Sequence, residues 1–181
     1  MMNTNTAYLE LIIGPMFSGK TSRLVDIYKQ CQFCNIPVSV INHSIDTRYH
    51  DTMLSTHDKV MIPCIKAKYI TDILDTLANS QVVIINEGQF FDDLYTTVVS
   101  LLNQGKKIYV GGLDGDFERK KFGHILDLIP LCDKVTKLTS LCSICKDGKP
   151  GIFSKRLTLE TEQTIVGSDI YIPVCRSCYN Q

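Results

Sequence analysis

A glycine-rich stretch near the N-terminus has the residue types and spacing of a phosphate-binding loop. In the pattern G-x-x-x-x-G-K-[ST], backbone N–H groups surround phosphates, the lysine neutralises their charge and the hydroxyl binds Mg²⁺. A strand-like run, 8–13, precedes the stretch, and an amphipathic segment, 22–33, follows it. This context predicts a site for a nucleoside triphosphate. Four residues match the pattern: Gly14, Gly19, Lys20 and Thr21.

A carboxylate follows a second strand-like run. The segment 81–86 is continuously apolar until Asn86, as strands buried on both faces are, and Glu87 comes next. Proteins with this kind of loop usually carry an acidic Mg²⁺ partner at the strand end. Asn86 offers an amide oxygen without charge, so the sequence predicts weaker metal binding. Glu87 is the best candidate for a general base, because a carboxylate near the γ-phosphate can accept a proton from an attacking hydroxyl.

Four of the eight cysteines form two C-x-x-C pairs near the C-terminus: Cys142, Cys145, Cys175 and Cys178. Four thiolates suit a tetrahedral Zn²⁺ with no open position, which indicates a structural rather than a catalytic metal. The 29 residues between the two pairs would form a long loop clamped at its base. A third pair, Cys31 and Cys34, ends the expected first helix, and we interpret both as buried small hydrophobic residues.

Composition limits the function classes. With 181 residues and 44% hydrophobic content the chain can bury a core, and 19 basic residues balance 19 acidic ones. Such a balance provides no electrostatic footprint for nucleic acid or an anionic membrane. No apolar run approaches the ~20 residues of a membrane span, and the N-terminus lacks a signal-peptide pattern. We expect a cytoplasmic protein without nucleic-acid or membrane partners.

Strand-like and helix-compatible runs alternate along the first part of the chain. The strand-like runs are 8–13, 36–42, 81–86 and 107–113, and the helix-compatible ones are 22–33, 69–78 and 92–107. This alternation predicts an α/β fold with a parallel sheet and a ligand beyond the carboxyl ends of the strands. The polar segment 43–59 has no clear period and is expected to be a long functional loop.

The composition and periodicity of the sequence change at about Thr139, after which the chain is turn-rich with short β-like runs. We therefore expect two units: a phosphate-loop α/β domain over 1–138 and a small zinc-binding unit over 139–181.

Three further groups of residues have weaker signals. Five aromatics near strand ends could form a stacking wall for a flat base, although scattered aromatics are more often core: Phe90, Phe91, Phe117, Phe122 and Tyr171. Six basic loop residues could reach phosphates, although most such residues are only solvated: Arg48, Arg119, Lys120, Lys121, Lys155 and Arg156. Four histidines lack metal or triad spacing and are interpreted as loop-surface residues: His43, His50, His57 and His124.

Taken together, the motifs resemble the zinc-containing, cytosolic-type (type II) thymidine kinases. They occur in order from about residue 9 to 179: GPMFSGKT, DTRY, STHD, NEGQFF, LDGDF…FG, VTKLTSLC and YIPVCRSCY. The resemblance implies transfer of the ATP γ-phosphate to the 5′-hydroxyl of thymidine or deoxyuridine, in nucleotide salvage for DNA synthesis. It implies a P-loop (RecA-like) parallel sheet flanked by helices and a zinc-held lasso that closes over the nucleoside. It also implies a homotetramer and feedback inhibition by thymidine triphosphate.

The resemblance assigns roles residue by residue. Glu87 would accept the proton, Thr21 would bind Mg²⁺, and the four cysteines would hold structural Zn²⁺. ATP and its metal would contact Gly14, Pro15, Met16, Phe17, Ser18, Gly19, Lys20, Thr21, Asp46, Arg48, Asn86 and Gln89. The nucleoside would contact Phe90, Leu113, Phe117, Phe122, Ser154, Glu162, Gln163, Thr164, Ile165, Val166 and Tyr171. Two departures stand out: the family usually has Asp at position 86 and Gly-Gly at 166–167.

Two other functions compete with a nucleoside kinase. An ATP-driven nucleic-acid-binding protein with a zinc ribbon would need a basic track for the phosphate backbone, which the neutral composition does not supply. A nucleotide sensor that binds without turnover is compatible with the uncharged Asn86.

Overall fold

The computed structural model of the chain describes residues 6–46, 52–56, 58–165, 167 and 170–181. Within them, one sheet has the strand order β5-β2-β6-β7-β1-β8, and every neighbouring pair is parallel. Its strands, in chain order, are β1 Tyr8–Ile13, β2 Val38–His43, β5 Ile65–Ala67, β6 Val82–Asn86, β7 Lys107–Gly112 and β8 Lys134–Lys137. The predicted α/β class with a parallel sheet is confirmed.

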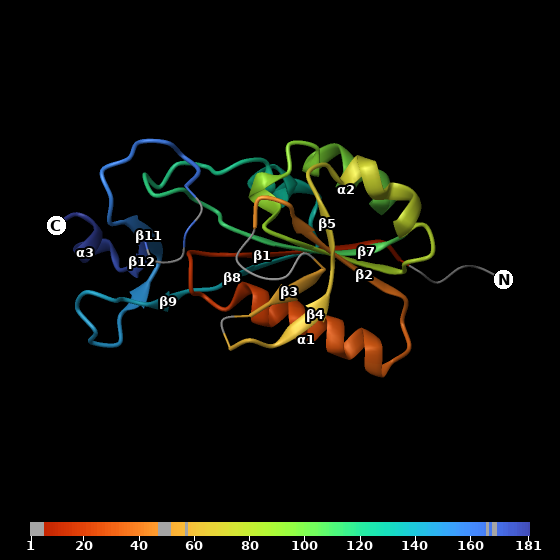
Figure 1. Ribbon diagram of the computed structural model, residues 1–181, viewed down its shortest axis with the longest axis horizontal. Coiled ribbons are helices and arrows are strands. Elements are labelled where there is room, and N and C mark those ends of the chain that lie inside the picture. The colour runs from red at the N-terminus through yellow and green to blue at the C-terminus, as the bar shows by residue number, and fades with distance from the viewer. Residues whose placement is uncertain (1–5, 47–51, 57, 166, 168–169) are drawn as a thin grey trace.

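Helices cover both faces of the sheet (Figure 1). On one face, helix α1 (Lys20–Phe33) buries Leu24, Ile27 and Cys31 together with the hairpin β3 (Met53–Ser55) and β4 (Met61–Pro63). On the other face lie α2 (Leu94–Asn103) and the 3-10 helices η1 (Ile70–Leu77) and η3 (Ile125–Leu131). No helix in the described part of the chain is long and apolar enough to cross a membrane.

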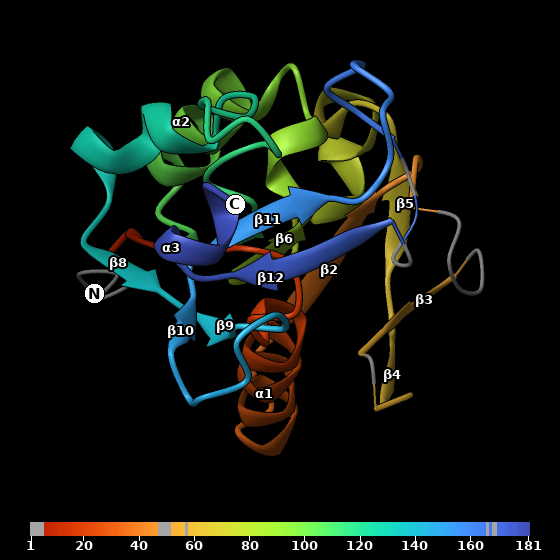
Figure 2. The same ribbon diagram turned by 90° about the vertical axis from the view of Figure 1, so that its left-hand side faces the viewer.

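The C-terminal unit lies beyond the carboxyl ends of the strands (Figures 1 and 2). It contains β9 (Ser140–Leu141), β10 (Pro150–Gly151), β11 (Phe153–Arg156), β12 (Tyr171–Val174) and the short helix α3 (Arg176–Tyr179). A separate apolar cluster that includes the four C-terminal cysteines stabilises it. The proposed boundary at 138/139 stays a prediction.

Local expectations are confirmed in part. The run 69–78 forms a helix as expected, of the 3-10 type. The segment 43–59 is not loop throughout, because strand β3 lies within it; its residues 47–51 and 57 lie outside the described residues. Cys31 is buried as expected, but Cys34 is exposed because it caps the C-terminal end of α1. Strands β5 and β8 were not expected. They are only three and four residues long, too short to show a period.

Candidate functional site

A cleft of about 990 Å³, part of it open to solvent, lies between the carboxyl ends of the strands and the C-terminal unit. Its wall contains eighteen of the expected site residues: Met16, Phe17, Ser18, Gly19, Lys20, Thr21, Asp46, Glu87, Gln89, Phe90, Leu113, Phe117, Phe122, Ser154, Gln163, Thr164, Ile165 and Tyr171. Segments from both ends of the chain therefore build one cavity.

Four of the described residues expected to contact ATP or the nucleoside are not in this wall. Gly14 and Pro15 form the start of the phosphate loop, and Asn86 ends β6. Glu162 lies in the segment 157–170 between β11 and β12, which we call the lasso. Arg48 and Val166 lie outside the described residues, as do His50 and His57. The wall also contains residues that we did not predict: Ser22, Ile45, Gly115, Asp116 and Gly167.

The phosphate loop turns directly into α1. The helix begins at Lys20, so its N-terminal N–H groups lie at the cleft, where they favour an anion. The Ser18 hydroxyl and the Lys20 ammonium both donate to the Pro15 carbonyl oxygen, at 2.8 and 2.6 Å. The Met16 N–H donates to the Ser154 hydroxyl at 3.0 Å, which joins the loop to the C-terminal unit.

Gly14 is required by a close backbone approach. Its φ is 149°, and a Cβ there would overlap the Leu138 carbonyl oxygen. We expect Gly14→Ala to lower the free energy of unfolding by about 1–3 kcal/mol, measured by chemical denaturation. Gly148→Ala is the matched control, because Gly148 also has a positive φ but open space around it. Equal losses in the two variants would show that the carbonyl approach contributes nothing.

Glu87 is held in an unusual conformation at the end of β6. Its φ of 55° and ψ of 42° lie in the left-handed region, which non-glycine residues seldom occupy except where surroundings impose it. The Gln89 amide donates to Glu87 Oε2 at 2.8 Å and accepts the Leu113 N–H at 3.0 Å. A Cβ at Gly123 would overlap the Gln89 carbonyl oxygen, so the polypeptide packs closely here. Gln89 thus orients Glu87 toward the cleft.

The donor set of the cleft fits Mg²⁺. The Thr21 hydroxyl and the Asp46 and Glu87 carboxylates line the same cavity, and Mg²⁺ prefers oxygen ligands of this kind. Asn86 is buried, is not part of the wall, and is linked to Asp46 through Asn42.

The aromatic wall is largely as expected. Phe90, Phe117, Phe122 and Tyr171 line the cleft, and the rings of Phe90 and Phe122 meet edge to face at 5.4 Å. The interpretation of Phe91 as part of this wall is wrong, because its side chain is fully buried in the core.

His43 is not a loop-surface residue. It ends β2, is 7% exposed, and its ring lies 4.7 Å from that of Phe91. Burial lowers the pKa of the imidazole, against the opposing effects of the Lys68 carbonyl and nearby carboxylates. Its Nδ1 accepts the Ile45 N–H at 3.1 Å, so a neutral ring stabilises the chain reversal that leads to Asp46. His124, by contrast, is half exposed and contacts Asp127.

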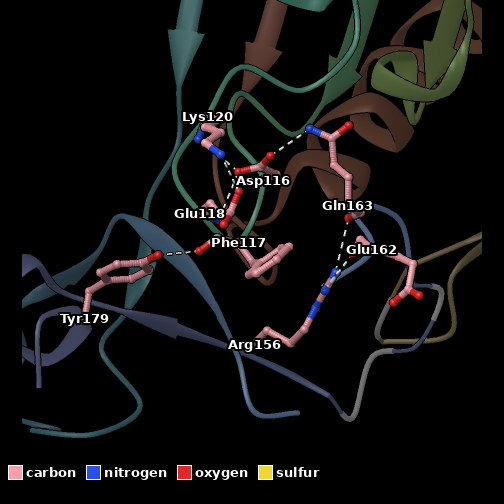
Figure 3. A network of polar contacts seen from close by, with 8 residues as sticks. All are labelled: Asp116, Phe117, Glu118, Lys120, Arg156, Glu162, Gln163 and Tyr179. Atoms are coloured by element: carbon pink, nitrogen blue, oxygen red, sulfur yellow. Dashed lines mark hydrogen bonds and ion pairs between the residues drawn. The ribbon is translucent and has the colours of Figure 1, made fainter. Parts of the chain in front are cut away.

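Arg156 organises the lasso rather than reaching a phosphate (Figure 3). It is 8% exposed, and its Nη1 donates to the carbonyl oxygens of Glu160 and Glu162 at 2.9 and 2.6 Å. Its Nη2 donates to the Gln163 carbonyl at 3.1 Å and to the Tyr171 hydroxyl at 2.6 Å. One guanidinium therefore binds three backbone carbonyls of the lasso and the Tyr171 hydroxyl at the start of β12.

The same network ties the lasso to the loop after β7 (Figure 3). The Arg156 guanidinium lies 3.7 Å from the centre of the Phe117 ring, and the Gln163 amide donates to Asp116 at 2.7 Å. Asp116 also accepts the N–H groups of residues 118 and 120, each at 2.9 Å. The Tyr179 hydroxyl donates to the Phe117 carbonyl. The lasso and this loop hold each other in place.

The other described basic candidates also have partners outside the cleft wall. Arg119 lies 4.2 Å from the centre of the Tyr179 ring, and Lys155 donates to the Cys178 carbonyl. Lys120 and Lys121 form ion pairs with Glu118 and Asp127. None of these four residues lines the cleft.

The four C-terminal cysteines form one cluster. Their sulfur atoms all lie within 4.8 Å of one another, compatible with the spacing of about 3.8 Å in a tetrahedral site with Zn–S bonds of about 2.3 Å. Burial raises the pKa of the Cys142 thiol, but hydrogen bonds from backbone N–H groups outweigh this effect and lower the pKa to about 6. These residues can hold a structural metal.

The cysteine cluster and the lasso are attached to opposite ends of one hairpin. Strands β11 and β12 pair Phe153 with Val174 next to the cysteines, and Arg156 with Tyr171 next to the lasso. A metal that fixes the first end therefore acts on the second through a short antiparallel ladder.

Comparisons with known proteins agree with this arrangement. The family model described as "Thymidine kinase" matches residues 7–179. The chain is 43% identical over 176 residues to the thymidine kinases of variola virus and vaccinia virus (strain Western Reserve), covering 97% of this chain and 98% of each relative. It is 42% identical over 173 residues to the thymidine kinase of sheeppox virus (strain KS-1), covering 95% and 96% of the two chains.

Proposed function

The chain belongs to the thymidine kinase family, and on this premise we propose how its residues transfer the γ-phosphate of ATP to the 5′-hydroxyl of thymidine. One observation carries the proposal: the phosphate loop, Glu87 and the aromatic wall line a single cleft closed by the lasso. A phosphate donor and a flat nucleoside can thus meet at one carboxylate.

Product analysis tests the reaction itself. The wild-type protein is incubated with Mg-ATP and either thymidine, deoxyuridine or a purine deoxynucleoside, and the products are separated. We expect equal amounts of ADP and thymidine monophosphate. ATP hydrolysis without nucleotide formation would contradict the proposal, and ATP binding without turnover would favour the nucleotide sensor.

The ATP phosphates would bind the N–H groups of residues 16–21 and the N-terminus of α1. Lys20 would exchange the Pro15 carbonyl for phosphate oxygens. Thr21 and Asp46 would hold Mg²⁺, which supplies charge neutralisation for the transferred group. Arg48 keeps its expected role as a phosphate contact, although it lies outside the described residues.

Glu87 would accept the proton of the 5′-hydroxyl as the phosphoryl group moves. Phosphoryl transfer depends mainly on positioning and on charge stabilisation. Gln89 supports both, because its hydrogen bond to Glu87 fixes the carboxylate oxygen relative to the strand end.

The nucleoside base would pack between the aromatic rings, with Leu113 and Ser154 beside it. Backbone groups of 162–166 would bind its polar edge. A pocket of this kind separates thymidine from deoxyuridine by only about 1–3 kcal/mol, because the two differ by one methyl group.

Arg156 provides a test of the lasso. We expect Arg156→Lys to raise the thymidine KM about 10–100-fold and leave the ATP KM unchanged, because a lysine keeps the charge but cannot hold four points at once. Steady-state kinetics with each substrate varied would measure this. Arg176→Lys, at an exposed arginine, is the control. A wild-type thymidine KM in Arg156→Lys would contradict the role, and an equal loss for ATP would indicate general destabilisation.

Several further properties are proposed on the family resemblance. These are a bound structural Zn²⁺, a homotetramer, feedback inhibition by thymidine triphosphate and a cytoplasmic location in nucleotide salvage. The cysteine donor set supports the zinc. Light scattering of the purified protein tests the tetramer, and inhibition kinetics with thymidine triphosphate test the feedback.

A further inference from the structure

A buried chain of hydrogen bonds links Asn86 to Asp46 through a residue with no assigned role. The Asn86 amide nitrogen donates to Asn42 Oδ1 at 3.0 Å, and the Asn42 amide nitrogen donates to Asp46 Oδ2 at 3.1 Å. All three residues are buried: Asn86 is 3% exposed, Asn42 2% and Asp46 6%. Asn42 and Asn86 stand opposite each other on the paired strands β2 and β6. Of the three, only Asp46 lines the cleft.

The direction of this chain follows from its charged end. A carboxylate can only accept hydrogen bonds, so Asn42 must turn its NH₂ group toward Asp46. The Asn42 carbonyl oxygen then faces residue 86 and needs a donor. Asn86 supplies one, whereas an ionised aspartate cannot.

The main chain of Asp46 is held independently. Lys66 on β5 donates to the Asp46 carbonyl oxygen at 2.7 Å, and the Asp46 N–H donates to the His43 carbonyl at 3.0 Å. Because Lys66 and His43 fix the backbone, the Asn42 contact acts on the orientation of the carboxylate within the cleft.

We propose that Asn42 is a positioning residue that orients the Asp46 carboxylate toward the metal of Mg-ATP, and that Asn86 is its matched partner. The carboxylate that residue 86 lacks is thus supplied by Asp46 from the neighbouring strand end. This inference deepens the proposed kinase function and rests on it.

The proposal reverses the expectation from charge alone. A negative charge added near the cation should tighten metal binding. In the Asn86→Asp variant, however, a carboxylate oxygen would face the Asn42 oxygen in a buried site. Either the Asn42 amide flips and loses its hydrogen bond to Asp46, or the added carboxyl group takes up a proton. Both outcomes weaken the metal site.

Magnesium titration of ATP binding, without nucleoside, tests the proposal by calorimetry on the full-length protein. We expect Asn86→Asp to raise the half-saturating Mg²⁺ concentration about tenfold, as for a lost partner of a metal ligand. Asn42→Asp should also raise the half-saturating Mg²⁺ concentration, because it places a second carboxylate, which can only accept hydrogen bonds, against the Asp46 carboxylate. Asn103→Asp adds the same charge at an exposed position and should change nothing. Unchanged or tighter Mg²⁺ binding in Asn86→Asp would overturn the proposal.

Two measurements keep the test decisive. Thermal unfolding identifies a variant that fails to fold; if both do, a crystal structure of the wild type with Mg-ATP decides. We expect Asp46 to contact the cation directly or through one water, and an Asp46 turned away from it would overturn the proposal. Thymidine phosphorylation by the wild type is measured separately, so a failure of the kinase function is distinguishable from a failure of this inference.

Discussion

The Glu87→Gln variant is expected to bind ATP and thymidine nearly as tightly as the wild type and to lose most of its turnover. Glutamine has the shape of glutamate, and its oxygen can still accept the 2.8 Å hydrogen bond from Gln89. It cannot accept the proton of an attacking hydroxyl. Loss of a general base lowers kcat by about 10²–10⁴-fold.

Single-turnover kinetics and calorimetry would separate the two effects. The matched control is Glu118→Gln, which removes a carboxylate from an exposed ion pair with Lys120 and should leave kcat unchanged. Wild-type kcat in Glu87→Gln would show that another group accepts the proton. A parallel loss of both substrate affinities would show that Glu87 shapes the cleft instead.

The Cys175→Ser variant is expected to lose its metal and its thymidine affinity while the larger unit stays folded and binds ATP. Four-thiolate zinc contributes about 10–16 kcal/mol in small zinc peptides. The hairpin between the cysteines and the lasso has only a small apolar cluster, which includes the cysteines themselves. The sheet has separate cores on its two faces, so its folding should not depend on the metal.

Zinc content, circular dichroism and separate titrations with ATP and thymidine would measure these outcomes. Cys34→Ser is the control, because Cys34 is exposed and lies outside the cluster. Normal thymidine binding in the zinc-free variant would refute a metal-dependent lid. Global unfolding would show that the two units fold as one.

The sequence predicts the elements and the site well where the chemistry is local. The phosphate loop and the C-x-x-C pairs are contiguous, and the strands β1 and β6 within the runs 8–13 and 81–86 are almost entirely buried in a parallel sheet. Their residue types therefore identify them without knowledge of their neighbours. Strand β8 lacks such a signal because it lies at the sheet edge and two of its residues are lysines.

The roles of Arg156 and Asn86 could not be predicted in this way. From the sequence alone Arg156 is expected to be a solvated cation. Its partners, the carbonyl oxygens of 160, 162 and 163, come close only when the lasso folds back over it. From the sequence alone Asn86 is only the replacement of an acidic metal partner by an uncharged residue. Its pairing with Asn42 follows from the register of β2 and β6. In both cases the partner is fixed by pairing between segments, which a single sequence does not specify.

The place of β1 in the sheet also constrains how the protein is made. β1 is synthesised before the other strands, yet it lies between β7 and β8. Tyr8 can pair with Lys107, and Ile13 with Lys137, only after those later residues have been synthesised. A ribosome-bound chain that ends before residue 107 therefore carries a strand of apolar residues without a neighbour to pair with. Such long-range pairing is slow and exposes the growing chain to aggregation. The phosphate loop, although encoded near the start, should be among the last parts of the nascent polypeptide to reach its final shape.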